Sequence, residues 1–269
     1  MTGAAPAAGR SRWPDGTEVF TKTRADAPPL LFDREALGLR CLQAAGARVP
    51  QVLSVDERHL TITWVEQGPA GSGRAPGTEA AFGRELAALH RTTGERFGAL
   101  DDEPRGWLGN CPVDLAPTPD WAESWLARRV VPLARQAAAA RTLPDAAVED
   151  AERIGPAALG PAEPPTLVHG DLWAGNRLVD GAGRNWLIDP CAHYGHREVD
   201  LAMMDLFGGF GPEALAAYQE EFPLAPGWEQ RIPVYQAVPL LVHAILFGGG
   251  YGRAAARALR AAADLGAGS

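Results

Sequence analysis

The N-terminal part of the chain alternates apolar and polar residues in three short stretches, and a period of two predicts β-strands. These stretches are residues 17–22, 52–55 and 59–65. Between the first two, helical spacing runs from Asp33, which we expect to be the N-cap, to about Ala45, with Gly46 as the stop. Residues 1–12 are rich in Ala, Gly and Pro without periodicity, so we expect irregular structure there.

Helical periodicity dominates the rest of the chain. Phe82, Leu86 and Leu89 share one face of a helix that we expect to begin at Thr78. Irregular structure is expected over residues 97–119. Further helices are predicted after Asp120 and over residues 212–221 and 228–247.

Three short strands interrupt this helical part and carry the most distinctive residues of the chain. They are predicted over residues 166–169, 176–179 and 185–188, and residues 180–183 have the composition of a turn. The resulting hairpin folds the chain back on itself, so we expect Asp189 to come close to Asn176 and Asp171. The pattern as a whole predicts an α+β fold.

Asp171, Asn176 and Asp189 together suit phosphoryl transfer. Each of them alone would be read as a turn or capping residue. Phosphoryl transfer needs an acceptor held in line and cations on the spreading negative charge, with little covalent help from the protein. A carboxylate at Asp171 can accept the proton of an acceptor hydroxyl, and Asn176 and Asp189 supply the hard oxygen ligands that Mg²⁺ prefers. The order of base, amide and second acid is that of kinases.

The stretches HGDLWAGN (residues 169–176), WLIDP (186–190) and YGHREVDLAM (194–203), followed by Leu206 to Gly209, resemble the fructosamine (ketosamine) kinase family. That family belongs to the aminoglycoside-phosphotransferase-like kinases. The Trp after HGDL and the YGHREVDLAM stretch look particular to ketosamine kinases. The resemblance extends from about Gly16 to Tyr251 and is most specific from His169 to Gly209.

The resemblance implies a bilobal protein-kinase-like fold that uses ATP and Mg²⁺. A small N-lobe of antiparallel strands with one helix would comprise residues 1–66. A larger, mainly helical C-lobe would comprise residues 67–269 and carry the catalytic loop, the metal site and the acceptor pocket.

The resemblance also assigns roles to single residues. Lys22 looks like the nucleotide-binding lysine, with Glu35 as the acid that holds it towards the phosphates. The nucleotide base would lie against the hinge formed by Trp64, Val65 and Glu66. Asp171 would be the catalytic base, and Asn176 and Asp189 would bind the metal.

Four further residues have supporting roles in this reading. Trp173 either forms a wall for a sugar or only packs the loop, and Trp107 is a candidate at the mouth of the acceptor pocket. His169 and Asp200 are expected to brace the catalytic loop. One feature departs from the family pattern, because Gly3, Gly9 and Gly16 form no recognisable glycine loop before Lys22.

Composition and charge narrow the possible partners. The chain has 269 residues and a net charge of -8, with no basic stripe, so a nucleic-acid surface is not expected. No apolar run approaches the length of a membrane span, and the N-terminus lacks the apolar core of a signal peptide. Three widely spaced cysteines, Cys41, Cys111 and Cys191, build neither a disulfide framework nor a Cys-x-x-Cys site. A monomeric cytoplasmic enzyme acting on a small molecule fits these features.

The predicted activity is ATP-dependent phosphorylation of the 3-hydroxyl of ketosamines, which are adducts of sugars with amines, as a deglycation repair reaction. The first alternative is a kinase of the same fold with another small acceptor, such as an aminoglycoside or choline. The second alternative is a non-catalytic nucleotide-binding module. The intact set of Asp171, Asn176 and Asp189 argues against the second alternative.

Overall fold

The structure is a computed structural model that describes residues 7–267. These residues divide into two compact units, and each unit is made of segments that are distant in the sequence. The first unit comprises 7–92, 169–192 and 209–222, and the second comprises 93–168, 193–208 and 223–267. The lobe boundary at residue 66 stays a prediction.

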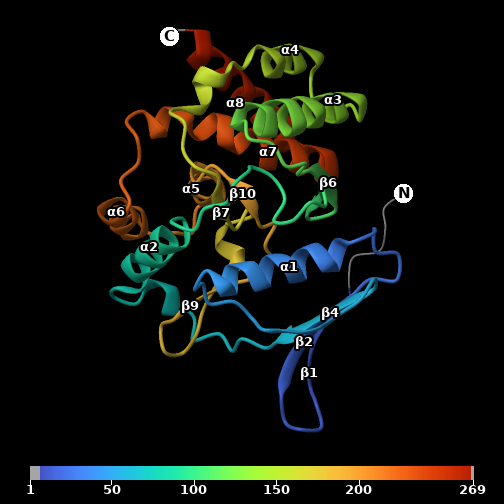
Figure 1. The fold of residues 1–269 in the computed structure, drawn as a ribbon, viewed down its shortest axis with the longest axis vertical. Coiled ribbons are helices and arrows are strands. Elements are labelled where there is room, and N and C mark those ends of the chain that lie inside the picture. The colour runs from blue at the N-terminus through green and yellow to red at the C-terminus, as the bar shows by residue number, and fades with distance from the viewer. Residues whose placement is uncertain (1–6, 268–269) are drawn as a thin grey trace. The chain divides into compact units, whose positions relative to one another are not determined.

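A four-stranded antiparallel sheet with the order β1-β2-β4-β3 begins the first unit. Its strands are β1 (Ala7–Arg12), β2 (Glu18–Thr23), β3 (Val52–Val55) and β4 (His59–Thr63). Val19, Leu60 and Ile62 are buried, which confirms the alternation seen in the sequence. Helix α1 (Leu31–Ala44) packs against β3 and β4, as Figure 1 shows.

The start of the chain was predicted wrongly. Residues 1–6 lie outside the described residues, but Ala7–Arg12 form strand β1, which pairs with β2. Strand β1 is an edge strand exposed along its whole length, so burial imposes no hydrophobic alternation on it. Glu18 of β2 instead forms ion pairs with Arg10 and Arg12 of β1. A hairpin with Gly16 (φ 90°) in its turn therefore precedes Lys22.

Helix α1 begins earlier than its sequence pattern predicts. Leu30 takes a left-handed conformation (φ 65°) before the first helical residue, Leu31. Asp33 is therefore an acidic residue of the first turn, where it suits the helix dipole, and it is not the N-cap. Phe32, Ala36, Leu39 and Leu42 are buried along one face, as the helical spacing requires.

Two helices of the first unit lie side by side, α2 (Thr78–Leu89) and α6 (Pro212–Glu221) (Figure 1). Gly83 permits their close approach, because a Cβ there would collide with the carbonyl oxygen of Ala214. His90, directly after α2, is fully buried, and its Nδ1 lies 2.8 Å from the hydroxyl of Tyr218. The predicted helix over residues 212–221 is confirmed.

A short hairpin, β8 (Arg177–Val179) and β9 (Asn185–Leu187), completes the first unit. Asp180 organises its turn. Its Oδ1 accepts hydrogen bonds from the backbone N–H of Ala182 (2.9 Å) and Arg184 (3.0 Å), and its Oδ2 accepts one from Trp186 Nε1 (3.0 Å). Burial tends to raise the pKa of Asp180, but these hydrogen bonds outweigh it, so that the pKa is lowered.

The second unit is mainly helical. Helices α7 (Trp228–Phe247) and α8 (Gly250–Ala267) pack along each other, α3 (Val131–Ala139) packs against α7, and α4 (Asp145–Arg153) packs against α8 (Figure 1). The helices of this unit are η2 (Glu123–Val130), α3 (Val131–Ala139), α4 (Asp145–Arg153), η3 (Pro156–Leu159), α5 (Glu198–Phe207), α7 (Trp228–Phe247) and α8 (Gly250–Ala267). Its strands are β5 (Arg105–Leu108), β6 (Cys111–Asp114), β7 (Thr166–Val168) and β10 (His193–Gly195).

Two further expectations from the sequence can be compared with the structure. The region predicted as irregular contains the antiparallel hairpin β5–β6, which turns at Gly109 and Asn110. The short strands of this hairpin contain Gly106 and Pro112, residues that disfavour strands, and this obscured the pattern. Within residues 7–267, no helix has both the length and the apolar character needed to cross a membrane.

Candidate active site

Three charged side chains from distant parts of the first unit meet at one point. Lys22 Nζ, on β2, donates hydrogen bonds to Glu35 Oε1 of α1 at 2.6 Å and to Asp189 Oδ1 after β9 at 2.7 Å. The side chains of Lys22 and Glu35 are only 13% and 14% exposed, whereas that of Asp189 is 44% exposed. The ammonium group is therefore held by a buried acid and an accessible acid.

Electrostatics favours a charged lysine in this arrangement. Burial tends to lower the pKa of Lys22, but the carboxylates of Glu35 and Asp189 outweigh it and raise the pKa. The pKa of Glu35 is raised by burial and by the nearby Asp189 carboxylate, and Lys22 counteracts this shift. Lys22 is thus the cation that allows a buried acid to lie beside Asp189.

Asp171 and Asn176 belong to one compact loop that follows β7. The amide Nδ2 of Asn176 donates to the backbone oxygen of Asp171 at 2.8 Å and to its carboxylate Oδ2 at 3.1 Å. The hydrogens of the Asn176 amide thus point to Asp171, and its Oδ1 is the atom left to act as a ligand.

Three hydrogen bonds order this loop and connect it to the segment that carries Asp189. His169 Nε2 donates to the backbone oxygen of Ile188 at 2.9 Å, and His169 Nδ1 accepts from the backbone N–H of Asp171 at 3.2 Å. These roles require the neutral tautomer with its proton on Nε2. The backbone N–H of Ile188 in turn donates to the oxygen of Asn176 at 3.0 Å. Asp171, Asn176 and Asp189 are therefore held in register by short contacts.

The backbone at Asp189 is unusual. Its φ of 55° lies in the left-handed region, which few residues other than glycine adopt. Aspartate tolerates this conformation better than most residues. The strand β9 therefore ends at Leu187, and the chain turns sharply at the residue that contacts Lys22.

A cavity of about 240 Å³ lies next to these charged groups. Its walls come from the sheet, from the segment after β4 and from the hairpin β8–β9. They consist of Phe20, Pro50, Ile62, Thr63, Trp64, Val65, Gln67, Leu178, Ile188 and Asp189. A mainly apolar slot that ends at a carboxylate suits a flat aromatic group that carries a polar or charged substituent.

The three predicted hinge residues differ in their positions. Trp64 and Val65 line the cavity. Glu66 is not among the lining residues. Its side chain is 69% exposed, accepts one hydrogen bond from Trp64 Nε1 (2.8 Å) and forms an ion pair with Arg10 (3.0 Å). Phe20, Leu178 and Ile188 were missed as lining residues. The signal for the last two was available, because they are apolar residues close to Asn176 and Asp189.

The two candidates for acceptor recognition, Trp173 and Trp107, and the candidate bracing residue Asp200 fall in both units. Trp173 lies in the loop of Asp171 and is 40% exposed, an unusual exposure for a large aromatic residue. Trp107 is in β5 and is partly buried, and Asp200 is in the first turn of α5 and is fully buried. Both belong to the second unit, and their roles stay predictions.

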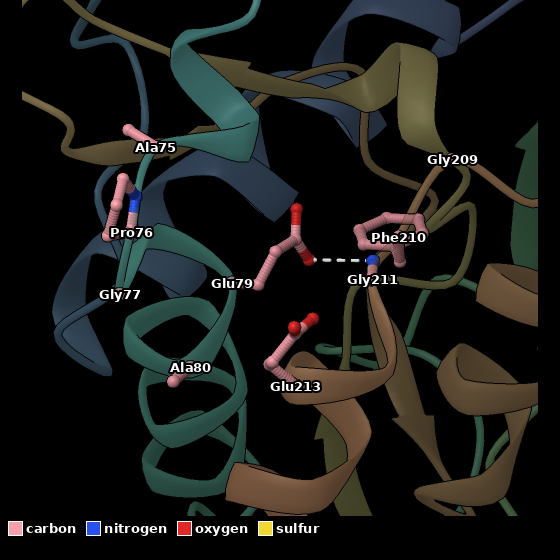
Figure 2. Close-up of a pocket in the computed structure, with 9 residues that line it drawn as sticks. All are labelled: Ala75, Pro76, Gly77, Glu79, Ala80, Gly209, Phe210, Gly211 and Glu213. Atoms are coloured by element: carbon pink, nitrogen blue, oxygen red, sulfur yellow. Dashed lines mark hydrogen bonds between the residues drawn. The ribbon is translucent and has the colours of Figure 1, made fainter.

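A second cavity, of about 460 Å³, lies in the first unit where α2 and α6 begin. Figure 2 shows the carboxylates of Glu79 and Glu213 directed into the space between these helices. Glu79 is already paired, because its Oε1 accepts from Arg177 Nη1 (2.6 Å) and its Oε2 accepts from the backbone N–H of Gly211 (3.0 Å). The sequence patterns gave no indication of this cavity.

Comparison with known proteins identifies the family. The family model described as fructosamine kinase matches residues 8–264. A probable ketoamine kinase of Thermus thermophilus is 38% identical over 247 residues, which cover 89% of this chain and 86% of that protein. A chloroplastic protein-ribulosamine 3-kinase of Oryza sativa subsp. japonica is 31% identical over 243 residues, covering 88% and 70% of the two chains.

Solved structures agree with these sequence matches. A crystal structure of a candidate fructosamine-3-kinase from Thermobifida fusca superposes with a TM-score of 0.86 at 40% identity, covering 97% of this chain and 93% of the other. An aminoglycoside-3'-phosphotransferase of type VIII gives a TM-score of 0.55 at 22% identity, covering 88% and 90%, and shows the fold alone. The predicted fold class is confirmed.

Proposed function

The chain belongs to the fructosamine kinase family, and we propose that it transfers the γ-phosphoryl group of ATP to the 3-hydroxyl of ketosamines. Membership of this family makes it a phosphotransferase with ATP as phosphoryl donor. The names of its relatives support a ketosamine acceptor, whose amine would be freed once the phosphorylated adduct breaks down. The natural role would then be deglycation repair.

The observation that carries this proposal is the joint geometry of two groups of residues. Lys22 is paired with Glu35 and Asp189, and Asp171 is hydrogen-bonded to Asn176 in a loop that His169 ties to the residue before Asp189. A protein that only binds nucleotide has no need of a base held beside the metal ligands. The arrangement therefore supports catalysis over the non-catalytic alternative.

In the proposed reaction, Lys22 contacts the phosphates of ATP, and Glu35 keeps its ammonium in place. Asp171 orients the acceptor hydroxyl and accepts its proton as the hydroxyl oxygen forms a bond to the γ-phosphorus. The bond from that phosphorus to the bridging oxygen breaks, and ADP leaves. Held in line by the protein, the acceptor needs no covalent intermediate.

The oxygen donors of Asp189 and Asn176 suit Mg²⁺. Asp189 offers an accessible carboxylate, and Asn176 has its amide hydrogens engaged by Asp171, so that Oδ1 is available. Two protein ligands leave positions on Mg²⁺ for water and for the phosphates of ATP. Bound Mg²⁺ would neutralise charge on the phosphates.

The rest of the proposal concerns the acceptor and the setting. The half-exposed Trp173 beside Asp171 would form a wall for the sugar, since aromatic faces pack well against C–H groups. Trp107 would contribute at the acceptor side, and Asp200 would brace the catalytic loop. We further propose a monomer in the cytoplasm, which suits the odd number of cysteines.

Substitution of Asp171 by Ala tests the catalytic role. Loss of the base should lower kcat by about 10³-fold or more, while the KM or Kd for MgATP changes little. The rate of ketosamine phosphorylation would be measured from the release of ADP. Nucleotide binding would be measured by calorimetry. Equal turnover by Asp171→Ala and the wild-type protein would refute the assignment of the base.

The position of the new phosphate tests the proposed acceptor. Phosphorus–proton NMR correlation of the product from fructose-lysine or ribulose-lysine should place the phosphate on the oxygen of carbon 3. A phosphate on another carbon would contradict the proposed regiochemistry. Turnover of only an aminoglycoside or choline would keep the fold and the mechanism but contradict the repair function.

A further inference from the structure

The indole of Trp173 rests on a glycine two residues further along the chain. A Cβ at Gly175 would lie 2.5 Å from both Cζ2 and Cζ3 of the indole, and closer still to Cη2. These three atoms belong to the six-membered ring. The benzo part of the indole therefore occupies the space that any side chain at position 175 would need.

The backbone at Gly175 does not itself require glycine. Gly175 is not among the glycines with positive φ, and it lies in the short 3₁₀ turn Ala174–Asn176. Alanine can adopt this conformation without strain. The three atoms nearest to a Cβ at this position all belong to Trp173, so the indole is the first obstacle to a side chain there.

The other side of the same turn is also closely packed. Gly209 has a φ of 91°, and a Cβ there would lie 2.5 Å from the Cβ of Ala174. Figure 2 shows Gly209 next to Phe210 at the edge of the larger cavity. Ala174 therefore packs closely against Gly209, which restricts movement of the turn in that direction.

Backbone hydrogen bonds link the same turn to the candidate catalytic residues. The N–H of Trp173 donates to the oxygen of Asp171 at 3.1 Å, and the N–H of Asn176 donates to the oxygen of Trp173 at 2.9 Å. These bonds hold the backbone of the turn that carries the indole next to Asp171, and the indole itself lies on Gly175.

We propose that Gly175 is a specificity-determining position for the acceptor, because its lack of a side chain seats the Trp173 indole as a half-exposed wall beside Asp171. Gly175 touches no reacting atom, so it acts by positioning Trp173. The inference rests on the proposed function, in that the wall is assigned to the sugar of the acceptor. A wall of this kind contributes to acceptor binding and not to nucleotide binding.

Substitution of Gly175 by Ala tests the proposal in a double-mutant cycle with Trp173→Ala. Gly175→Ala should raise the KM for the acceptor about tenfold or more, with kcat within about threefold and the KM for ATP within about twofold of wild type. In the Trp173→Ala background, where the ring is absent, Gly175→Ala should have no further effect on the acceptor KM. Gly181→Ala is the matched control, since a Cβ there meets nothing within 4 Å and its φ is not positive.

A spectroscopic readout follows the indole directly. With 5-fluorotryptophan incorporated, the ¹⁹F resonance of Trp173, assigned from a Trp173→Phe variant, should move in Gly175→Ala and stay in place in Gly181→Ala. An unmoved resonance, an additive effect in the double-mutant cycle, or a fall in kcat without a change in acceptor KM would overturn the proposal. If Gly175→Ala alone fails to fold, Trp173→Ala/Gly175→Ala should still fold and match Trp173→Ala, and failure of the double variant would also overturn it.

The experiment separates this inference from the proposed function. All variants are measured with the acceptor that the wild-type protein phosphorylates best among ketosamines, an aminoglycoside and choline. A best acceptor that is not a ketosamine would contradict the proposed substrate. The proposed role of Gly175 would then still be tested by the acceptor KM and by the ¹⁹F shift of Trp173.

Discussion

Replacement of Lys22 by Met tests the electrostatics of the site. The change removes the ammonium that contacts Glu35 at 2.6 Å and Asp189 at 2.7 Å. Glu35 is left as a carboxylate whose side chain is only 14% exposed. An unpaired buried charge costs about 3–5 kcal/mol. Protonation of Glu35 and the exposure of Asp189 reduce this cost. We therefore expect the free energy of unfolding of Lys22→Met to be roughly 2–4 kcal/mol below that of wild type near pH 8.

The pH dependence of this loss has a definite sign. Burial already raises the pKa of Glu35, and removal of Lys22 raises it further. A group whose folded pKa is raised contributes stability that is present below its unfolded pKa, about 4.3 for Glu, and is lost as pH rises through the folded pKa. The deficit of Lys22→Met relative to wild type should therefore shrink as the pH is lowered from 8 to 5.

Urea unfolding followed by circular dichroism at both pH values measures the deficit. A loss of 3 kcal/mol corresponds to a midpoint shift of about 1 M urea. Lys22→Met/Glu35→Gln should recover most of the midpoint at pH 8 while kcat/KM stays about 10²–10³-fold below wild type. The reasoning is refuted if the double variant is no more stable than Lys22→Met, or if the deficit does not depend on pH.

The remaining predictions concern stability. Gly83→Ala should destabilise the protein, because its Cβ would collide with the carbonyl oxygen of Ala214. We expect a loss of roughly 1–3 kcal/mol in the free energy of unfolding and a melting temperature lower by several degrees. An unchanged melting temperature by calorimetry would contradict the close packing of α2 on α6. Asp180→Asn should lower the free energy of unfolding at pH 7, measured by urea denaturation, by roughly 1–3 kcal/mol. Because the folded pKa of Asp180 is lowered, its contribution is present above the unfolded pKa, about 3.9, and is lost as the pH falls through the folded pKa. The difference between wild type and Asp180→Asn should therefore begin to shrink below about pH 4 and keep shrinking on further acidification; a constant difference would contradict this.

The parts of the fold that bury one face were predictable from the sequence. Strands β2 and β4, helix α1 and helix α2 each place an apolar stripe in the core, and periodicity reports such a stripe. Strand β1 has no buried face, since it lies at the edge of the sheet and is held by pairing and ion pairs. Its sequence therefore carries no alternation to detect.

The candidate site was predictable in its components rather than in its contacts. Asp171, Asn176 and Asp189 lie within one hairpin region, so their proximity follows from local turns. Lys22 and Asp189 are 167 positions apart, and no local pattern places one against the other. Their contact, like the seat of Trp173 on Gly175, depends on packing in three dimensions.

Acceptor-dependent ATP consumption with Mg²⁺ tests the central claim most directly. The panel comprises ribulose-lysine, fructose-lysine, an aminoglycoside, choline and no acceptor, with ADP release measured by a coupled assay. Turnover confined to the two ketosamines is predicted, and the ratio between them would identify the preferred sugar. Turnover confined to the aminoglycoside or choline, or no turnover with any acceptor, would contradict the assignment of this chain as a ketosamine kinase.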